Sequence, residues 1–141
     1  MDVIELAGRL LFASAFLISP SGVFAQAPRL AGSPMMRKYP TGLAIAMVRL
    51  SCAFSMGGAV LVGLGLFPDL GALLILGFLV PVTLTMHRFW EVEPGLPRKQ
   101  KRDQFLSNAS LAGGALLLFA FMNQAQDVGL GVLSDPLFGR L

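Results

Sequence analysis

Long apolar segments separated by short polar ones dominate the pattern of this chain of 141 residues. A membrane-spanning helix needs roughly 20 predominantly apolar residues to cross about 30 Å of hydrocarbon. Four segments meet this requirement, and they cover approximately residues 3–24, 43–67, 70–86 and 105–122. The pattern therefore predicts an all-α fold, in which a single transmembrane domain of residues 1–141 forms a four-helix bundle.

The connections between these segments add two expectations. The second and third segments are joined by a tight turn at residues 67–69, so the two helices should be antiparallel neighbours. Pro81 lies inside the third segment, where neighbouring helices can satisfy the carbonyl group that a proline leaves free. Residues 123–141 are polar and then amphipathic, and glycine and proline interrupt them. We expect this tail to lie along the membrane interface.

The first segment has a second interpretation as a secretory signal peptide, because Ala25-Gln26-Ala27 resembles a small-x-small cleavage site. A signal peptide carries positive charge before its apolar core, whereas this chain carries Asp2 and Glu5 there. The charge pattern therefore favours a first membrane helix.

Composition supports a membrane protein. Hydrophobic residues make up 55% of the chain and charged residues only 13%, whereas a soluble domain carries about 25% charged residues. The formal net charge is +3, but the basic residues are concentrated in two connections, so we expect no nucleic-acid partner. The single cysteine, Cys52, excludes an intramolecular disulfide. The single histidine, His87, excludes a bis-histidine haem and a multi-histidine metal cluster within this chain.

The basic residues also predict an orientation, because lysine and arginine are enriched in cytoplasmic connections. Four crossings place the first and third connections on the same side of the membrane. Their basic residues are Arg29, Arg37 and Lys38 in the first connection, and Arg88, Arg98, Lys99, Lys101 and Arg102 in the third. We expect both connections to be cytoplasmic and both termini to be external, in the plasma membrane. The stretch 98–102 should also bind anionic lipid.

Small residues recur at a spacing of four, which allows helix backbones to approach closely within a membrane. They are Ser55, Ala59 and Gly63 in the second segment, and the pairs Ala109 with Gly113 and Ser110 with Gly114 in the fourth. Gly71 and Gly77 in the third segment fit the same bundle. We interpret them as packing positions within one bundle, with a homo-oligomer as the alternative.

Ionisable side chains within membrane segments are costly, so each of them requires a partner or a function. Glu5 precedes Arg9 by four residues, the favourable order for an ion pair, and we interpret this intramembrane pair as structural. Arg49 has no acidic residue one turn away in its own segment. The expected topology places Arg49 at the same depth as several polar residues. The resulting candidates for binding a ligand or headgroup are Arg49, His87, Arg88, Trp90 and Asn108.

Two interpretations of this cluster are open. An arginine, a histidine that titrates near neutral pH and an amide donor can hold a quinone carbonyl, a lipid headgroup or a small anion. Alternatively, Arg49 and Arg88 extend to lipid phosphates, and Trp90 belongs to the interfacial aromatic belt.

Several motifs resemble the DoxX family of small four-helix membrane proteins. Residues 8–12, Gly-Arg-Leu-Leu-Phe, are similar to the first helix of that family. The similar stretches of its second half are residues 67–74, 81–83, 86–90, 105–108 and 111–117, of which His87-Arg88-Phe89-Trp90 followed by Phe105-x-x-Asn108 is the most specific part. The chain departs from the family pattern at Ser107, where lysine is usual, and at residues 22–24, where a Gly-Lys or Gly-His pair is common.

The resemblance also implies a function. The family takes its name from a subunit of a thiosulfate:quinone oxidoreductase, and some relatives are described as membrane anchors of oxidoreductase assemblies. This implies a non-catalytic accessory or anchor subunit of a larger redox- or quinone-linked membrane complex, with lipids and other membrane subunits as partners. Two alternatives stay open: a quinone-linked oxidoreductase subunit with its site at Arg49 and His87, and a transporter or binding protein for lipids or small molecules. We expect no catalytic residue, no metal and no cofactor except a quinone.

Overall fold

The computed structural model describes residues 3–34, 36–124 and 137–138, and within these ranges it contains helices and no strand. Four helices are long and apolar enough to cross a membrane: α1 (Val3–Ala25), α3 (Thr41–Leu64), α4 (Pro68–Met86) and α5 (Leu96–Gln124). Two are short: α2 (Ala27–Ala31) and the 3-10 helix η1 (Phe89–Glu91). The predicted all-α four-helix transmembrane bundle is confirmed.

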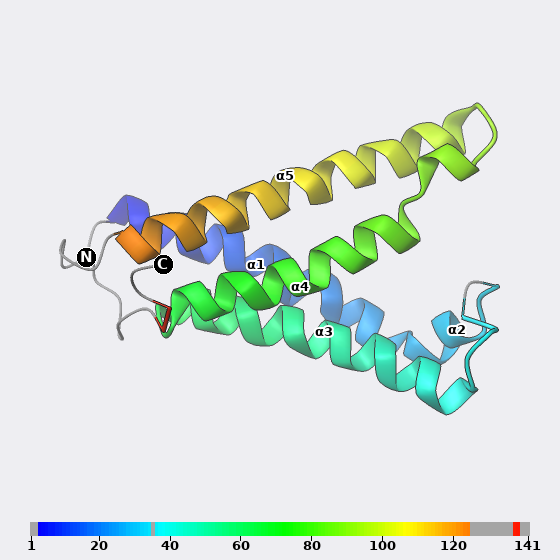
Figure 1. Cartoon of the computed structure of the whole chain (residues 1–141), viewed down its shortest axis with the longest axis horizontal. Coiled ribbons are helices and arrows are strands. Elements are labelled where there is room, and N and C mark those ends of the chain that lie inside the picture. Colours follow the sequence, from blue (N-terminus) through cyan, green and yellow to red (C-terminus); the bar gives the residue numbers. More distant parts are fainter. Residues whose placement is uncertain (1–2, 35, 125–136, 139–141) are drawn as a thin grey trace.

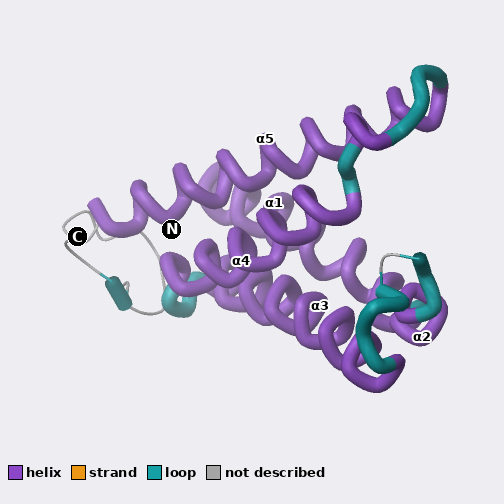
Figure 2. Tube along the Cα trace, turned by 45° about the vertical axis from the view of Figure 1, so that its right-hand side comes forward, coloured by secondary structure: helices purple, strands orange, loops and turns teal. Residues whose placement is uncertain are grey.

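The long helices pack in the order α1, α3, α4 and α5, and α3 and α4 form an antiparallel hairpin (Figure 1). α1 and α5, at the two sides of this arrangement, share few close backbone contacts. Figure 2 shows α2 and the connection between α4 and α5 at the same end of the bundle, opposite the end at which α5 finishes. Both basic connections therefore lie at one end, which we call the basic end.

The turn between α3 and α4 explains why α3 ends before the predicted residue 67. Gly65 adopts a left-handed conformation with φ 68°, and the N–H of Leu66 donates to the carbonyl of Leu61 at 2.9 Å. Glycine adopts this conformation without a steric penalty and closes the helix. Pro68 is the first residue of α4. A backbone N–H at this position would have no partner within the helix, so proline, which lacks this group, is well tolerated there.

The core is formed by buried side chains from all four long helices. They are Ala13 and Phe16 of α1, Ala59 and Val62 of α3, Ile75 and Leu79 of α4, and Ala115 of α5. A second cluster of Ala27, Val48 and Cys52 holds α2 against α3. Lipid is as apolar as these side chains, so dense packing rather than removal from water holds membrane helices together.

Glycines of α3 and α4 allow these two helices to approach each other closely. A Cβ atom on Gly58 would lie 2.7 Å from the carbonyl oxygen of Gly71, and a Cβ on Gly71 would lie 2.8 Å from that of Gly58. Gly63 packs α3 against α1, since its Cβ would lie 3.4 Å from that of Ala13. Cβ atoms on Gly77 and Gly113 would meet nothing within 4 Å. The small residues of the helices therefore differ in role.

α5 begins at Leu96 and not near residue 105 as predicted. The basic stretch 98–102 is helical, because lysine, arginine and glutamine are good helix formers even where the sequence is not apolar. Of the predicted interfacial tail, residues 125–136 and 139–141 lie outside the described residues.

Candidate functional site

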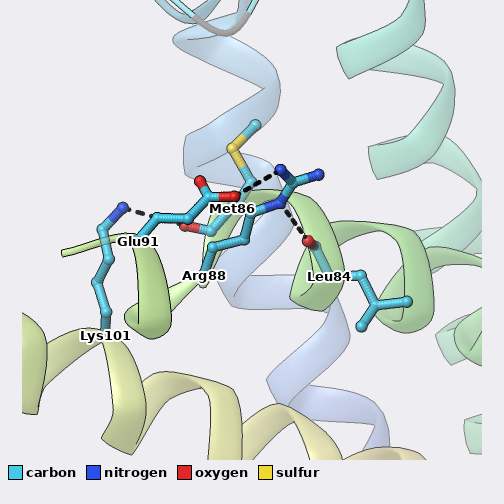
Figure 3. A network of polar contacts seen from close by, with 5 residues as sticks. All are labelled: Leu84, Met86, Arg88, Glu91 and Lys101. Carbon is cyan, nitrogen blue, oxygen red and sulfur yellow. Dashed lines mark hydrogen bonds and ion pairs between the residues drawn. The ribbon is translucent and has the colours of Figure 1, made fainter.

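The polar side chains at the connection between α4 and α5 cap the end of α4 (Figure 3). Arg88 donates from Nε to the carbonyl of Leu84 at 2.8 Å and forms an ion pair of 2.9 Å with Glu91. Nζ of Lys101 donates to the carbonyl of Met86 at 3.4 Å. The last carbonyls of a helix lack partners within the helix, and cations are favourable beside them. These contacts give Arg88 a structural role.

The other candidates from this connection lie close to Arg88. His87 directly follows α4, is half-buried and lies beside Lys101 and the side chain of Gln104. The exposed Trp90 packs edge-on against Phe89 and Phe105, with ring centroids 5.2 Å and 5.8 Å away. Such an aromatic group suits the interface between membrane and water.

Asn108 lies about one turn beyond Phe105 on α5 and is half-buried. Its side chain forms no hydrogen bond with any residue of the described ranges. The structure thus places Asn108 on the same helix as the partners of His87, but not in the polar network around Arg88.

Arg49 belongs to a different part of the basic end. It is exposed on α3, and its guanidinium carbon lies 5.4 Å from the ring centroid of Phe24 on α1, within range of a cation–π interaction. No hydrogen bond, ion pair or ring contact between described residues joins Arg49 to His87, Arg88 or Trp90. In Figures 1 and 2 the connection between α4 and α5 stands apart from α2 and the start of α3. A shared depth does not bring the five candidates into contact.

The intramembrane pair lies near the opposite end of the bundle. Arg9 Nε is 3.7 Å from Glu5 Oε1, and the two side chains are 4% and 14% exposed. Opposite charges reduce the cost of holding each group in the bilayer. Arg9 also lines a groove between α1 and α5, together with Gly8, Phe12, Val62, Gly114, Leu117, Leu118 and Phe121.

Asp69 is a buried acid in the turn between α3 and α4, and the sequence pattern predicts no role for it beyond that turn. It lies in the first turn of α4, is fully buried, and accepts a hydrogen bond of 2.6 Å from the backbone N–H of Phe138. A carboxylate in the first turn of a helix is stabilised by the helix dipole. The sequence indicates that Asp69 lies in such a turn, because it directly follows Pro68. Nothing local in the sequence signals the contact with Phe138.

Among the described residues, no group of three or more histidine, cysteine, aspartate or glutamate side chains is placed to hold a metal ion. Buried hydroxyl groups of Ser55 and Thr83 lie in the bundle interior, without a hydrogen-bond partner among these residues.

Four apolar helices of membrane-spanning length, packed as an antiparallel bundle, define a multi-pass α-helical membrane protein. The family model described as DoxX matches residues 4–88, which is more than half of the chain. The chain belongs to the DoxX family. The match extends from α1 through α4 and ends before Trp90 and Asn108. Comparisons with curated proteins and with solved structures gave no match.

Proposed function

We propose that this DoxX family protein is a non-catalytic accessory or anchor subunit of a larger redox- or quinone-linked complex. The redox link rests on the family resemblance. The subunit role rests on one structural observation, the outer face of α5, which the other described helices leave uncovered.

The outer face of α5 is suited to a neighbouring helix. Of the four spans, α5 has the smallest share of buried residues. Ala109 and Ser110 are exposed, and a Cβ on Gly113 would meet nothing within 4 Å. Small residues allow another helix to approach closely, and close approach is what associates helices in lipid. A partner subunit would use this face.

The alternative quinone site at Arg49 and His87 receives less support. Arg49 contacts Phe24 and lies apart from the connection between α4 and α5, while Arg88 caps α4. A transporter or lipid-binding role has one favourable feature, the largely apolar groove between α1 and α5.

Copurification tests the subunit proposal. We expect gentle detergent extraction to retain a partner membrane protein whose absorption spectrum shows a redox cofactor. Gly113→Leu should lower partner recovery about fivefold or more, because an inserted leucine overpacks a close helix contact. Gly77→Leu is the matched control, since its Cβ also meets open space but on α4. Recovery of the chain alone, or equal recovery with both variants, would contradict the proposal.

We also propose that the basic end faces the cytoplasm and that the termini are external, in the plasma membrane. The support is the excess of lysine and arginine in the two connections that meet at this end.

A further inference from the structure

The start of α5 carries a stretch of basic side chains at the basic end. Because α5 begins at Leu96, this stretch is helical, and its members are Arg98, Lys99, Lys101 and Arg102. In Figures 1 and 2 the connection that leads into it stands apart from α2 and the start of α3. Lys99 and Arg102 are exposed, and Arg98 is half-buried. A helix therefore presents these cations in a fixed arrangement on an uncovered part of the protein.

These cations differ in the partners that they already have. Lys101 caps the end of α4. Arg98 and Lys99 form no hydrogen bond or ion pair with the residues that the structure describes. Arg102 lies 3.7 Å from Asp103, but these side chains are 53% and 56% exposed, and exposed pairs of this kind contribute little. Across residues 88–105 basic residues outnumber acidic ones, so the segment keeps a net positive charge.

Three aromatic rings lie next to this stretch. Phe105 of α5 packs edge-on against Phe89 and the half-exposed Trp90, with centroids 5.5 Å and 5.8 Å away. Arg98 and Arg102 precede Phe105 by seven and three positions, which places all three on one side of α5. At 1.5 Å per residue, the two arginines start about 10 Å and about 4.5 Å farther out along the helix than Phe105.

The order along α5 is therefore an apolar span, then aromatic rings, then arginines. Aromatic side chains of membrane proteins concentrate at the depth of the lipid headgroups, and basic side chains just outside the span attract anionic lipids. The planar guanidinium group matches phosphate oxygens. An anion that meets Arg98 and Arg102 beside Trp90 is thus at headgroup depth, where lipid phosphates are concentrated.

We propose that this arginine–tryptophan face, formed by Arg98, Arg102 and Trp90, binds anionic phospholipids. The phosphates lie against the two arginines, and the upper part of the acyl chains lies beside Trp90. The binding depends neither on the proposed subunit role nor on the side of the membrane that the basic end faces.

Trp90 is the one tryptophan of the sequence, so its fluorescence reports on this face in the unmodified chain. The full chain is reconstituted in vesicles of phosphatidylcholine and phosphatidylglycerol, and one of the two lipids carries bromine close to the headgroup on its acyl chains. Bromine quenches a tryptophan that it contacts. We expect phosphatidylglycerol to bind beside Trp90 about fivefold more strongly than phosphatidylcholine, the effect of about one charge.

Raising the salt concentration to about 1 M, where charges are screened beyond roughly 3 Å, should bring the two binding constants together. Equal quenching by the two lipids at low salt, or quenching by neither, would overturn the proposal and leave this face to an acidic protein partner.

Two double variants locate the effect. Arg98→Gln with Arg102→Gln should reduce the preference for phosphatidylglycerol to less than about twofold, and glutamine keeps a helix propensity close to that of arginine. Arg37→Gln with Lys38→Gln is the matched control, because it removes the same charge from exposed positions in the other basic connection. This control should keep the preference. Equal losses in the two double variants would show that net charge attracts the lipid, which would contradict a site at the arginine–tryptophan face.

Discussion

Gly58→Ala should lower the free energy of unfolding of the bundle by about 1–3 kcal/mol, the usual cost of overpacking. The added Cβ would lie 2.7 Å from the carbonyl oxygen of Gly71 and 3.0 Å from Cγ1 of Ile75. The first of these atoms belongs to the backbone, so α3 and α4 must move apart to accommodate the methyl group. Unfolding in mixed micelles, followed by circular dichroism, measures the change.

The adjacent Gly57 provides a matched control. Its Cβ would meet nothing within 4 Å, so Gly57→Ala should leave stability unchanged or raise it by up to about 1 kcal/mol through higher helix propensity. Gly71→Ala should resemble Gly58→Ala, and the double variant should cost less than the sum, because both methyl groups disturb one contact. Equal stabilities of Gly57→Ala and Gly58→Ala would show that α3 and α4 do not pack through these glycines.

Asp69→Ala should destabilise the turn between α3 and α4 by about 1.5–3 kcal/mol, the usual contribution of a hydrogen bond to a charged group. The substitution removes the acceptor of the Phe138 N–H and the carboxylate at the positive end of α4. Residues 137–138 should then be cleaved faster in limited proteolysis in detergent. Asp69→Asn retains an acceptor oxygen and should have a smaller effect.

Asp103→Ala is the control for the loss of an acid. Asp103 is exposed and contacts Arg102 at 3.7 Å, so its removal should change stability by less than about 0.5 kcal/mol. Cleavage at an unchanged rate in Asp69→Ala would show that the carboxylate does not hold the C-terminal segment.

The fold was predictable because the lengths of apolar segments determine the number of crossings. The ends of the helices were less predictable from the sequence. α3 stops at Leu64 because Gly65 takes a left-handed conformation, although the sequence stays apolar to Phe67. α5 begins at Leu96 because helix propensity extends through a charged stretch that no apolar pattern marks.

Contacts between helices were harder to predict than the helices. A spacing of four selected Ser55, Ala59 and Gly63, but the glycine of α3 that packs against α4 is Gly58, since the rotation of a helix toward its neighbour is set by packing. Arg49 shares a depth with His87, yet depth does not fix which neighbour a side chain meets, and Arg49 lies on Phe24.

The contact of Asp69 with Phe138 illustrates the same limit at longer range. It joins positions 69 residues apart, and a long sequence separation leaves no periodic signal. The loose ion pair of Glu5 and Arg9 was accessible from the sequence because both residues lie on one helix, four positions apart.

Single-cysteine labelling tests the four crossings most directly. Cys52 is the one cysteine of the sequence, so Cys52→Ala gives a background without reactive thiols, to which Val3→Cys, Lys38→Cys and Glu93→Cys are added one at a time. All three added positions are exposed. A membrane-impermeant maleimide applied to intact cells should label position 3 and leave positions 38 and 93 unlabelled until the cells are opened. Labelling of positions 38 and 93 from opposite sides of the membrane would contradict a bundle of four spans.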